Sequence, residues 1–183
     1  MALSFSFPSE WITANISPAD MIHTIRKWWH YLLGKRGELA HMDHKDAYMA
    51  KVVMDIHRNR TGKQLTRVPL AQLEPIHRID RDSALRSARE RADALRAHRN
   101  ALLATKLLDS EALQTIIPSV SQIKVVRDGD RWLTFEGNGR LYAMREVFDA
   151  DDGMRVEVEE YLFDDPRSVL RRLRRVRKLN RLE

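Results

Sequence analysis

The sequence predicts an α+β protein with a small mixed β-sheet, flanking helices and a helical N-terminal extension. Three observations predict this fold class. Before Pro118, apolar residues recur at helical spacing over long stretches. After Pro118, short β-rich runs are separated by turns that contain glycine and aspartate. The last stretch, which begins at Asp165, returns to a helical pattern with one apolar stripe.

Composition limits the kind of protein. The 183 residues suffice for one domain with a real hydrophobic core, alone or with a helical extension. The absence of cysteine excludes disulfides, thiolate metal sites and a cysteine nucleophile, and it fits a reducing compartment. No apolar run approaches the roughly 20 residues that cross a bilayer, and the N-terminus lacks the pattern of a signal peptide. We therefore expect a soluble, cytoplasmic protein, and its net charge of +6 indicates anionic partners.

The first predicted helix begins near Ser17 and ends near Gly34. Ser17 is a good N-cap, Pro18 suits the first helical position, and Gly34 can end the helix. Its apolar residues fall on one face: Met21, Ile22, Ile25, Trp28, Trp29, Leu32 and Leu33. Such a face usually packs on the core or contacts a second copy of the chain, and the second case would give a homodimer through the N-terminal helices. Peripheral contact with a membrane surface is the minority alternative.

A second helix is predicted from about Asp43 to His57, and residues 59–63 have the composition of a loop. We place a domain boundary in that loop. The chain then consists of a helical N-terminal extension, a main domain and a basic amphipathic C-terminal helix, over residues 1–62, 63–165 and 166–183.

The main domain opens with a segment bracketed by Pro69 and Pro75, which predicts a brief edge strand or a single turn followed by an extended loop. A helix is predicted from Asp82 to about Leu108. Arg99 falls where the next apolar residue is due, so we expect the helix to bend there, to pair Arg99 with an acid, or to protrude. A short helix capped by Ser110 follows.

The β-rich part begins with two strands, residues 122–127 and 131–135, which are predicted to form a hairpin across Asp128-Gly129-Asp130. A third long strand is predicted from Arg155 to Phe163. Asp165 and Pro166 start the final helix.

Between the hairpin and the third strand, the stretch Phe135-Glu136-Gly137-Asn138-Gly139-Arg140 joins a strand to a helix predicted at 141–148. Glycine permits positive φ and close approach of a ligand, and the first helical turn offers free N–H groups to an anion. Arg140 adds a planar cation that suits phosphate or carboxylate. The pattern predicts an anion-binding loop, and it fits equally well a connection whose glycines only allow a tight turn.

The order of these elements resembles the ParB/sulfiredoxin-like superfamily over roughly residues 67–163. The similarity rests on the Val-Pro-Leu…Leu-Glu-Pro segment, the hairpin, and a Gly-x-x-Arg loop that opens a helix with an alanine three residues on. In that superfamily the loop binds nucleotide phosphates, and members include a nucleotide-dependent partition protein, a sulfinic-acid reductase and a free-serine kinase. The resemblance implies the same fold, with ATP or CTP and Mg²⁺ as cofactors.

Gly137 and Arg140 match the family's glycine and phosphate-binding arginine, which implies that Gly137, Asn138, Gly139 and Arg140 form the cofactor-binding loop. Asn138 stands where sulfiredoxin has its catalytic cysteine, so reductase activity is not expected. The Gly-Glu-Arg-Arg form of partition proteins is absent, and no helix-turn-helix domain follows the strand. Gly139 also departs from the His or Thr often found before the arginine. Glu136 aligns with an acidic residue of kinase-like members.

The chemistry predicted for this loop is phosphoryl transfer or nucleotide hydrolysis on a nucleotide or other phosphorylated small molecule. Glu136 could act as a general base or hold Mg²⁺, while Arg140 and the N–H groups of Gly139 and Arg140 could stabilise the transferring group. Glu74 and His77 are further catalytic candidates. Each acid or imidazole has a structural alternative: a loop cap for Glu136, a solvated turn for Glu74, and a structural role for His77.

The C-terminal helix raises a hypothesis of a different class, a nucleic-acid-binding module without catalysis. Cations on one amphipathic helix can follow a phosphate backbone with salt-sensitive affinity. Aromatic residues for stacking bases are absent from this helix, so base recognition is not expected. The predicted contacts are Arg171, Arg172, Arg174, Arg175, Arg177 and Lys178. The plainer alternative is a solvated cationic face.

Overall fold

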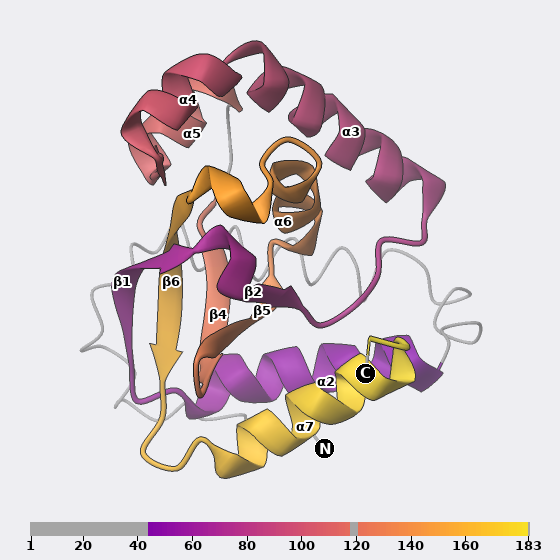
Figure 1. The fold of residues 1–183 in the computed structure, drawn as a ribbon. Coiled ribbons are helices and arrows are strands. Elements are labelled where there is room, and N and C mark those ends of the chain that lie inside the picture. Colours follow the sequence, from indigo (N-terminus) through magenta and orange to yellow (C-terminus); the bar gives the residue numbers. More distant parts are fainter. Residues whose placement is uncertain (1–43, 118–120, 183) are drawn as a thin grey trace, which may run out of the picture. The chain divides into compact units, whose positions relative to one another are not determined.

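A computed structural model describes residues 44–117 and 121–182, which belong to one compact unit that starts at His44. Helices and strands alternate irregularly along this unit (Figure 1). In chain order they are α2 (His44–Asn59), β1 (Gly62–Pro69), β2 (Leu73–Pro75), α3 (Asp82–Ala97), α4 (Arg99–Thr105), β3 (Leu107–Leu108), α5 (Ser110–Ile116), β4 (Ile123–Asp128), β5 (Arg131–Glu136), α6 (Asn138–Arg145), β6 (Arg155–Leu162) and α7 (Arg167–Leu179). Short 3₁₀ turns, η3 (Leu70–Gln72) and η4 (Ala150–Asp152), complete the list.

The strands form one mixed six-stranded sheet in the order β1-β6-β4-β5-β2, with the short β3 also paired to β6. β1 runs antiparallel to β6, and β4 and β5 form the expected antiparallel hairpin. β6 lies parallel to β4, and β2 lies parallel to β5. The α+β fold class with a mixed sheet is therefore confirmed for the described residues.

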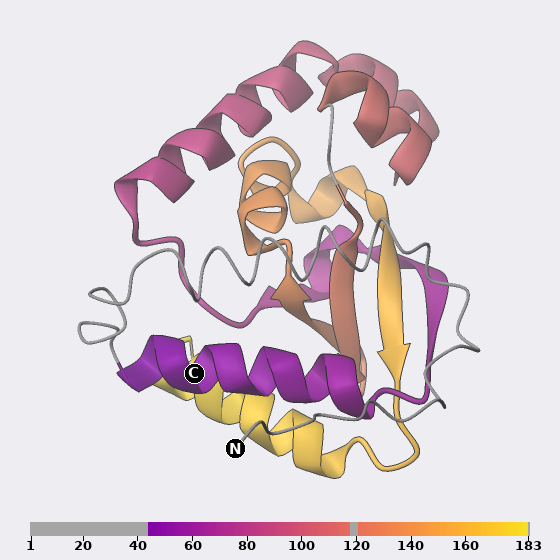
Figure 2. The same cartoon turned by 180° about the vertical axis from the view of Figure 1, so that it is seen from behind.

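Helices cover both faces of the sheet (Figures 1 and 2). On one face, α3, α4, α5 and α6 enclose the main core, where small residues such as Ala92 of α3 and Ala143 of α6 let these two helices pack closely together. On the other face, α2 and α7 lie side by side. The apolar stripe predicted for the final helix is buried at Val169, Leu173 and Val176, as expected for a helix that places one side against a sheet.

The helix predicted from Asp82 to about Leu108 is divided, and this part of the prediction was wrong. α3 ends at Ala97, α4 begins at Arg99, and Leu108 belongs to β3. Arg99 explains the break, because its guanidinium donates to Asp152 at 2.8 Å and to the Val147 carbonyl at 3.1 Å. Of the expected outcomes for Arg99, the bend and the acidic partner both occur.

The loop predicted at residues 59–63 is shorter than expected, because Asn59 ends α2 and a strand that was not predicted begins at Gly62. β1 starts at Gly62 and pairs with β6 along its whole length. The boundary placed between residues 62 and 63 falls within the compact unit, since α2 packs on α7 and buries Val52, Val53 and Ile56. The helix predicted near Ser17 to Gly34, and the homodimer predicted through it, lie outside the described residues.

Across residues 44–117 and 121–182, none of the helices has the length and apolar character needed to span a membrane.

Candidate anion site at the glycine loop

The predicted loop lies at the open end of the β4–β5 hairpin, where β5 ends at Glu136 and α6 begins at Asn138. Gly137 connects them with φ of 96°, in the left-handed region that favours glycine. Gly139, in contrast, is helical, and a Cβ there would make ordinary contacts with Arg91 and Ile79. Only the first of the two glycines is therefore required by the backbone.

Asn138 is buried and acts as a bridge. Its Oδ1 accepts a hydrogen bond from the Ile76 amide at 3.1 Å. That bond ties the start of α6 to the segment that follows β2. The side chain predicted to line the cofactor site thus positions the loop.

Arg140 folds back over the glycine. A Cβ at position 137 would lie 2.8 Å from Arg140 Nη2, so a side chain there would displace the guanidinium from this position. Arg140 Nη1 is buried and has no hydrogen-bond partner among the described residues. Burial, and secondarily the positive charge of Arg91, lowers the pKa of Arg140 to about 10. The guanidinium therefore stays charged at neutral pH, although its buried Nη1 lacks a hydrogen-bond acceptor within the described part of the chain.

Arg91, on α3, brings a second guanidinium to the same loop. Its Nη1 lies 3.6 Å from the position of a Cβ on Gly139. Two cations on separate helices thus flank the start of α6. The Arg140 N–H, expected to face an anion, donates to the Gly137 carbonyl at 2.9 Å instead. The hydrogen-bond donors that this site could offer an anion are therefore mainly the guanidinium groups of Arg140 and Arg91, and not backbone N–H groups.

Glu136 lies beside these cations but is bonded to other partners. Its Oε1 is 2.5 Å from His57 Nε2, and its Oε2 is 2.6 Å from Lys124 Nζ. Burial alone would raise the pKa of Glu136, but the hydrogen bonds and charges of His57 and Lys124 outweigh burial and hold it at about 2. Glu136 is accordingly a carboxylate at all physiological pH values.

His57, near the end of α2, is held from both ring nitrogens. Its Nδ1 lies 3.2 Å from the Tyr161 hydroxyl, and the rings of Phe135 and Tyr161 meet it edge-on at centroid distances of 5.7 and 5.3 Å. Arg60 donates to the His57 carbonyl. Burial raises the pKa of Tyr161, so the phenol keeps its proton. A proton on Nε2 lets the imidazole donate to Glu136, while Nδ1 faces the Tyr161 hydroxyl.

Sequence reasoning missed Arg91, His57, Lys124 and Tyr161 as members of this site. They come from α3, α2, β4 and β6, and the contact of His57 with Glu136 spans 79 residues of sequence. No motif links these positions. The one local clue was the hairpin, whose register sets Lys124 opposite Glu136.

The other two catalytic candidates have structural partners. Glu74 accepts from Arg131 at 3.3 Å and pairs with Arg177 at 2.6 Å. His77 Nδ1 lies 2.8 Å from the Arg78 carbonyl. Within the described part of the chain, neither side chain hydrogen-bonds to the glycine loop.

The cations of α7 are largely engaged within the protein. Arg174 donates two hydrogen bonds to the Asp128 carboxylate and lowers the pKa of that carboxyl group. Arg177 is buried and also donates to the Pro75 carbonyl. The remaining predicted contacts divide into engaged and exposed groups: Arg172 pairs with Asp55, Arg175 lies over the Tyr48 ring at 5.3 Å, and Arg171 and Lys178 are exposed.

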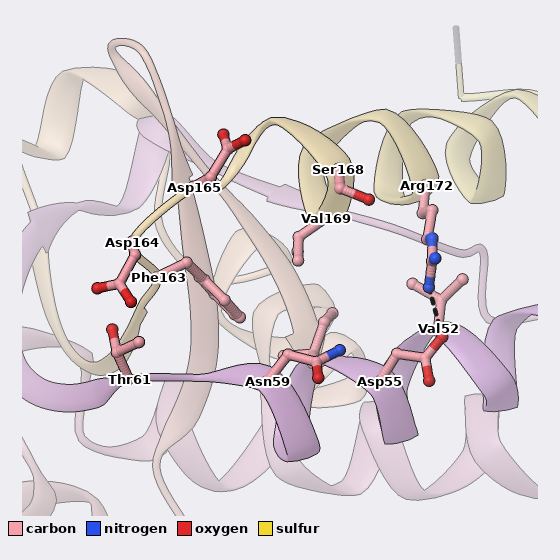
Figure 3. A pocket seen from close by; sticks show the side chains of 11 residues that line it. Val52, Asp55, Asn59, Thr61, Phe163, Asp164, Asp165, Ser168, Val169 and Arg172 are labelled. Atoms are coloured by element: carbon pink, nitrogen blue, oxygen red, sulfur yellow. Dashed lines mark hydrogen bonds and ion pairs between the residues drawn. The ribbon is translucent and has the colours of Figure 1, made fainter.

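A hollow of about 270 Å³ lies elsewhere, between α2, α7 and the segment that joins β6 to α7 (Figure 3). Val52, Ile56 and Val169 give it an apolar floor. Figure 3 shows Arg172 reaching across it to Asp55. Asp165 accepts hydrogen bonds from the Arg167 amide and guanidinium at the start of α7. These contacts join two helices and cap one of them.

No group of three or more His, Cys, Asp or Glu side chains within the described ranges is placed to hold a metal ion. No family model, curated protein or solved structure matches this chain.

Proposed function

We propose that the Glu136–Arg140 loop binds the phosphate of a nucleotide or another phosphorylated small molecule, with Arg140 and Arg91 as the groups that contact it. The observation that carries the proposal is the buried, unpartnered Nη1 of Arg140. A buried N–H group without a hydrogen bond is costly, so proteins seldom keep one without a compensating partner.

A phosphate group would supply that partner. Guanidinium matches phosphate with two parallel N–H···O bonds. An anion between Arg140 and Arg91 would also offset the charge of Arg91, which after burial is the second cause of the lowered pKa of Arg140. The N-terminal end of α6 adds a favourable dipole for negative charge. Carboxylates bind the same groups but carry less charge, so a phosphorylated ligand fits the two cations better.

The resemblance to the ParB/sulfiredoxin-like superfamily supports the same location, because Gly137 and Arg140 are the positions that match its phosphate-binding motif. ATP or CTP with Mg²⁺ is the ligand that this similarity favours. Phosphoryl transfer or nucleotide hydrolysis at the same loop would require a catalytic group in addition to the phosphate-binding cations. A carboxylate with a pKa of about 2 and both oxygens engaged is a weak proton acceptor, so Glu136 supports binding better than base catalysis.

Calorimetric titration tests the proposal. ATP, CTP and inorganic pyrophosphate, each with Mg²⁺, are titrated into the wild type and into Arg140→Met. Arg89→Met is the matched control, because Arg89 is an exposed arginine of α3 and the substitution removes the same charge. We expect binding in the wild type and the control, and at least about a tenfold loss in Arg140→Met. Equal affinity in all three proteins, or none in the wild type, would reject the proposal.

The nucleic-acid alternative predicts salt-sensitive affinity for DNA or RNA that depends on α7. The internal partners of Arg172, Arg174 and Arg177 reduce the charge that this helix can offer. A filter-binding assay with Arg171→Met/Lys178→Met distinguishes the two hypotheses, since these exposed positions are outside the glycine loop.

A further inference from the structure

Glu136 and Arg140 carry opposite charges on one short loop, and yet they form no hydrogen bond within the described residues. The carboxylate is close enough to raise the pKa of Arg140 through its charge. Its oxygens are directed to His57 and Lys124 instead, at 2.5 and 2.6 Å. The guanidinium keeps Nη1 unpartnered. Glu136 and Arg140 thus interact through their charges but not through a hydrogen bond.

We propose that His57 and Lys124 are positioning residues that hold the Glu136 carboxylate away from Arg140 and so leave Arg140 Nη1 unpartnered for an anionic ligand. This inference rests on the proposed phosphate-binding function. Without the two partners, Glu136 would be the nearest anion to Arg140. An internal carboxylate would then occupy the guanidinium at far higher effective concentration than any solute.

The surroundings of His57 suit such a role. Phe135 and Tyr161 pack edge-on against the imidazole, and the Tyr161 hydroxyl holds Nδ1, so the ring has one orientation. That orientation directs Nε2 at Glu136. Arg60 fixes the backbone carbonyl of His57 at the end of α2. The donor is therefore held in place before any ligand arrives.

Lys124 completes the arrangement from the neighbouring strand. Cross-strand pairing sets it opposite Glu136 in the β4–β5 hairpin, and its side chain is only 15% exposed. The two partners take one oxygen each, which leaves no carboxylate oxygen without a charged or polar donor. A single loss would free one oxygen to turn toward Arg140.

The test measures inorganic pyrophosphate affinity by calorimetry at pH 7.5 in four proteins: wild type, His57→Phe, Glu136→Gln, and the double variant. His57→Phe keeps an aromatic ring of similar size but removes the donor to Glu136. We expect its affinity to fall about tenfold, because the freed carboxylate competes for Arg140. Glu136→Gln is expected to bind at least as tightly as the wild type. The double variant is expected to recover wild-type affinity, since the competing charge is gone.

Recovery in the double variant separates a positioning role from a general loss of structure, because a damaged fold is not repaired by a second substitution. Lys124→Met and Lys124→Met/Glu136→Gln provide a second, independent pair. The inference is overturned if His57→Phe and Lys124→Met bind like the wild type, or if the double variants stay as weak as the single ones. Failure of the wild type to bind any phosphate compound would instead overturn the proposed function and this inference with it.

Discussion

Gly137 and Arg140 are packed so closely that a single added carbon would displace the guanidinium. A Cβ on residue 137 would lie 2.8 Å from Arg140 Nη2 and 3.1 Å from Ile123 Cγ1. The glycine at the end of β5 therefore does two things. It gives the backbone its left-handed turn, and it makes room for the cation on which the proposed anion site depends.

Gly137→Ala is expected to destabilise the protein by about 1–3 kcal/mol, because alanine is strained at a φ of 96° and its methyl group displaces Arg140. Gly139→Ala is the matched control. Position 139 is helical and has room for a Cβ, so this change should stabilise by up to about 1 kcal/mol. Urea unfolding of both variants measures the difference, and equal effects at the two glycines would contradict the account.

Arg140→Met is expected to raise the free energy of unfolding by about 1–2 kcal/mol in buffer free of multivalent anions, since it replaces a buried, unsatisfied charge with an apolar chain. The same variant should no longer be stabilised when pyrophosphate is added. Thermal unfolding with and without pyrophosphate tests both statements. A variant less stable than the wild type in the absence of anions would show that the guanidinium has an internal structural role.

The lowered pKa of Glu136 predicts that the free energy of unfolding falls in acid. Because its pKa is about 2 in the folded protein and 4.5 ordinarily, its ionised form stabilises the fold above about pH 5. That stabilisation, at most about 3 kcal/mol, is lost as the pH falls from 4.5 through 2. The stability difference between wild type and Glu136→Gln should therefore shrink over this window in unfolding curves measured at each pH. A difference that does not change with pH would be inconsistent with the His57 and Lys124 contacts.

Arg177→Met is expected to cost about 2–4 kcal/mol, because it removes a buried guanidinium from Glu74 and from the Pro75 carbonyl. Arg171→Met removes the same charge from an exposed position on the same helix and should change stability by less than about 0.5 kcal/mol. Chemical unfolding compares them. Similar small effects for both would mean that the α7 arginines form a merely solvated cationic face.

Local patterns were sufficient to predict the hairpin, the strand–loop–helix around Gly137, β6 and α7. In each of these elements, the spacing of apolar residues and the position of the turn residues match the side that is buried and the place where the chain turns. The strand β1 was missed because Lys63, Gln64 and Thr66 are polar, and only pairing with β6 makes the segment a strand.

The side chains that surround the glycine loop could be predicted only in part, for the same reason. Gly137 and Arg140 are recognisable because their chemistry is encoded in a few consecutive residues. His57, Lys124 and Arg91 reach the loop only through the packing of α2, β4 and α3, and sequence spacing carries no trace of such contacts. Arg177 was predicted to contact nucleic acid because it lies on a basic helix. In the structure it pairs instead with Glu74, which lies 103 residues away in the sequence.

The proposed function depends on the Arg140 guanidinium as the group that binds the ligand. Titration of ATP and CTP with Mg²⁺ into the wild type and Arg140→Met, with Arg89→Met as control, tests it most directly. We predict binding by the wild type and the control, and affinity at least about tenfold weaker in Arg140→Met. Wild-type protein that binds neither nucleotide, or an Arg140→Met variant that binds as well as the wild type, would contradict the account.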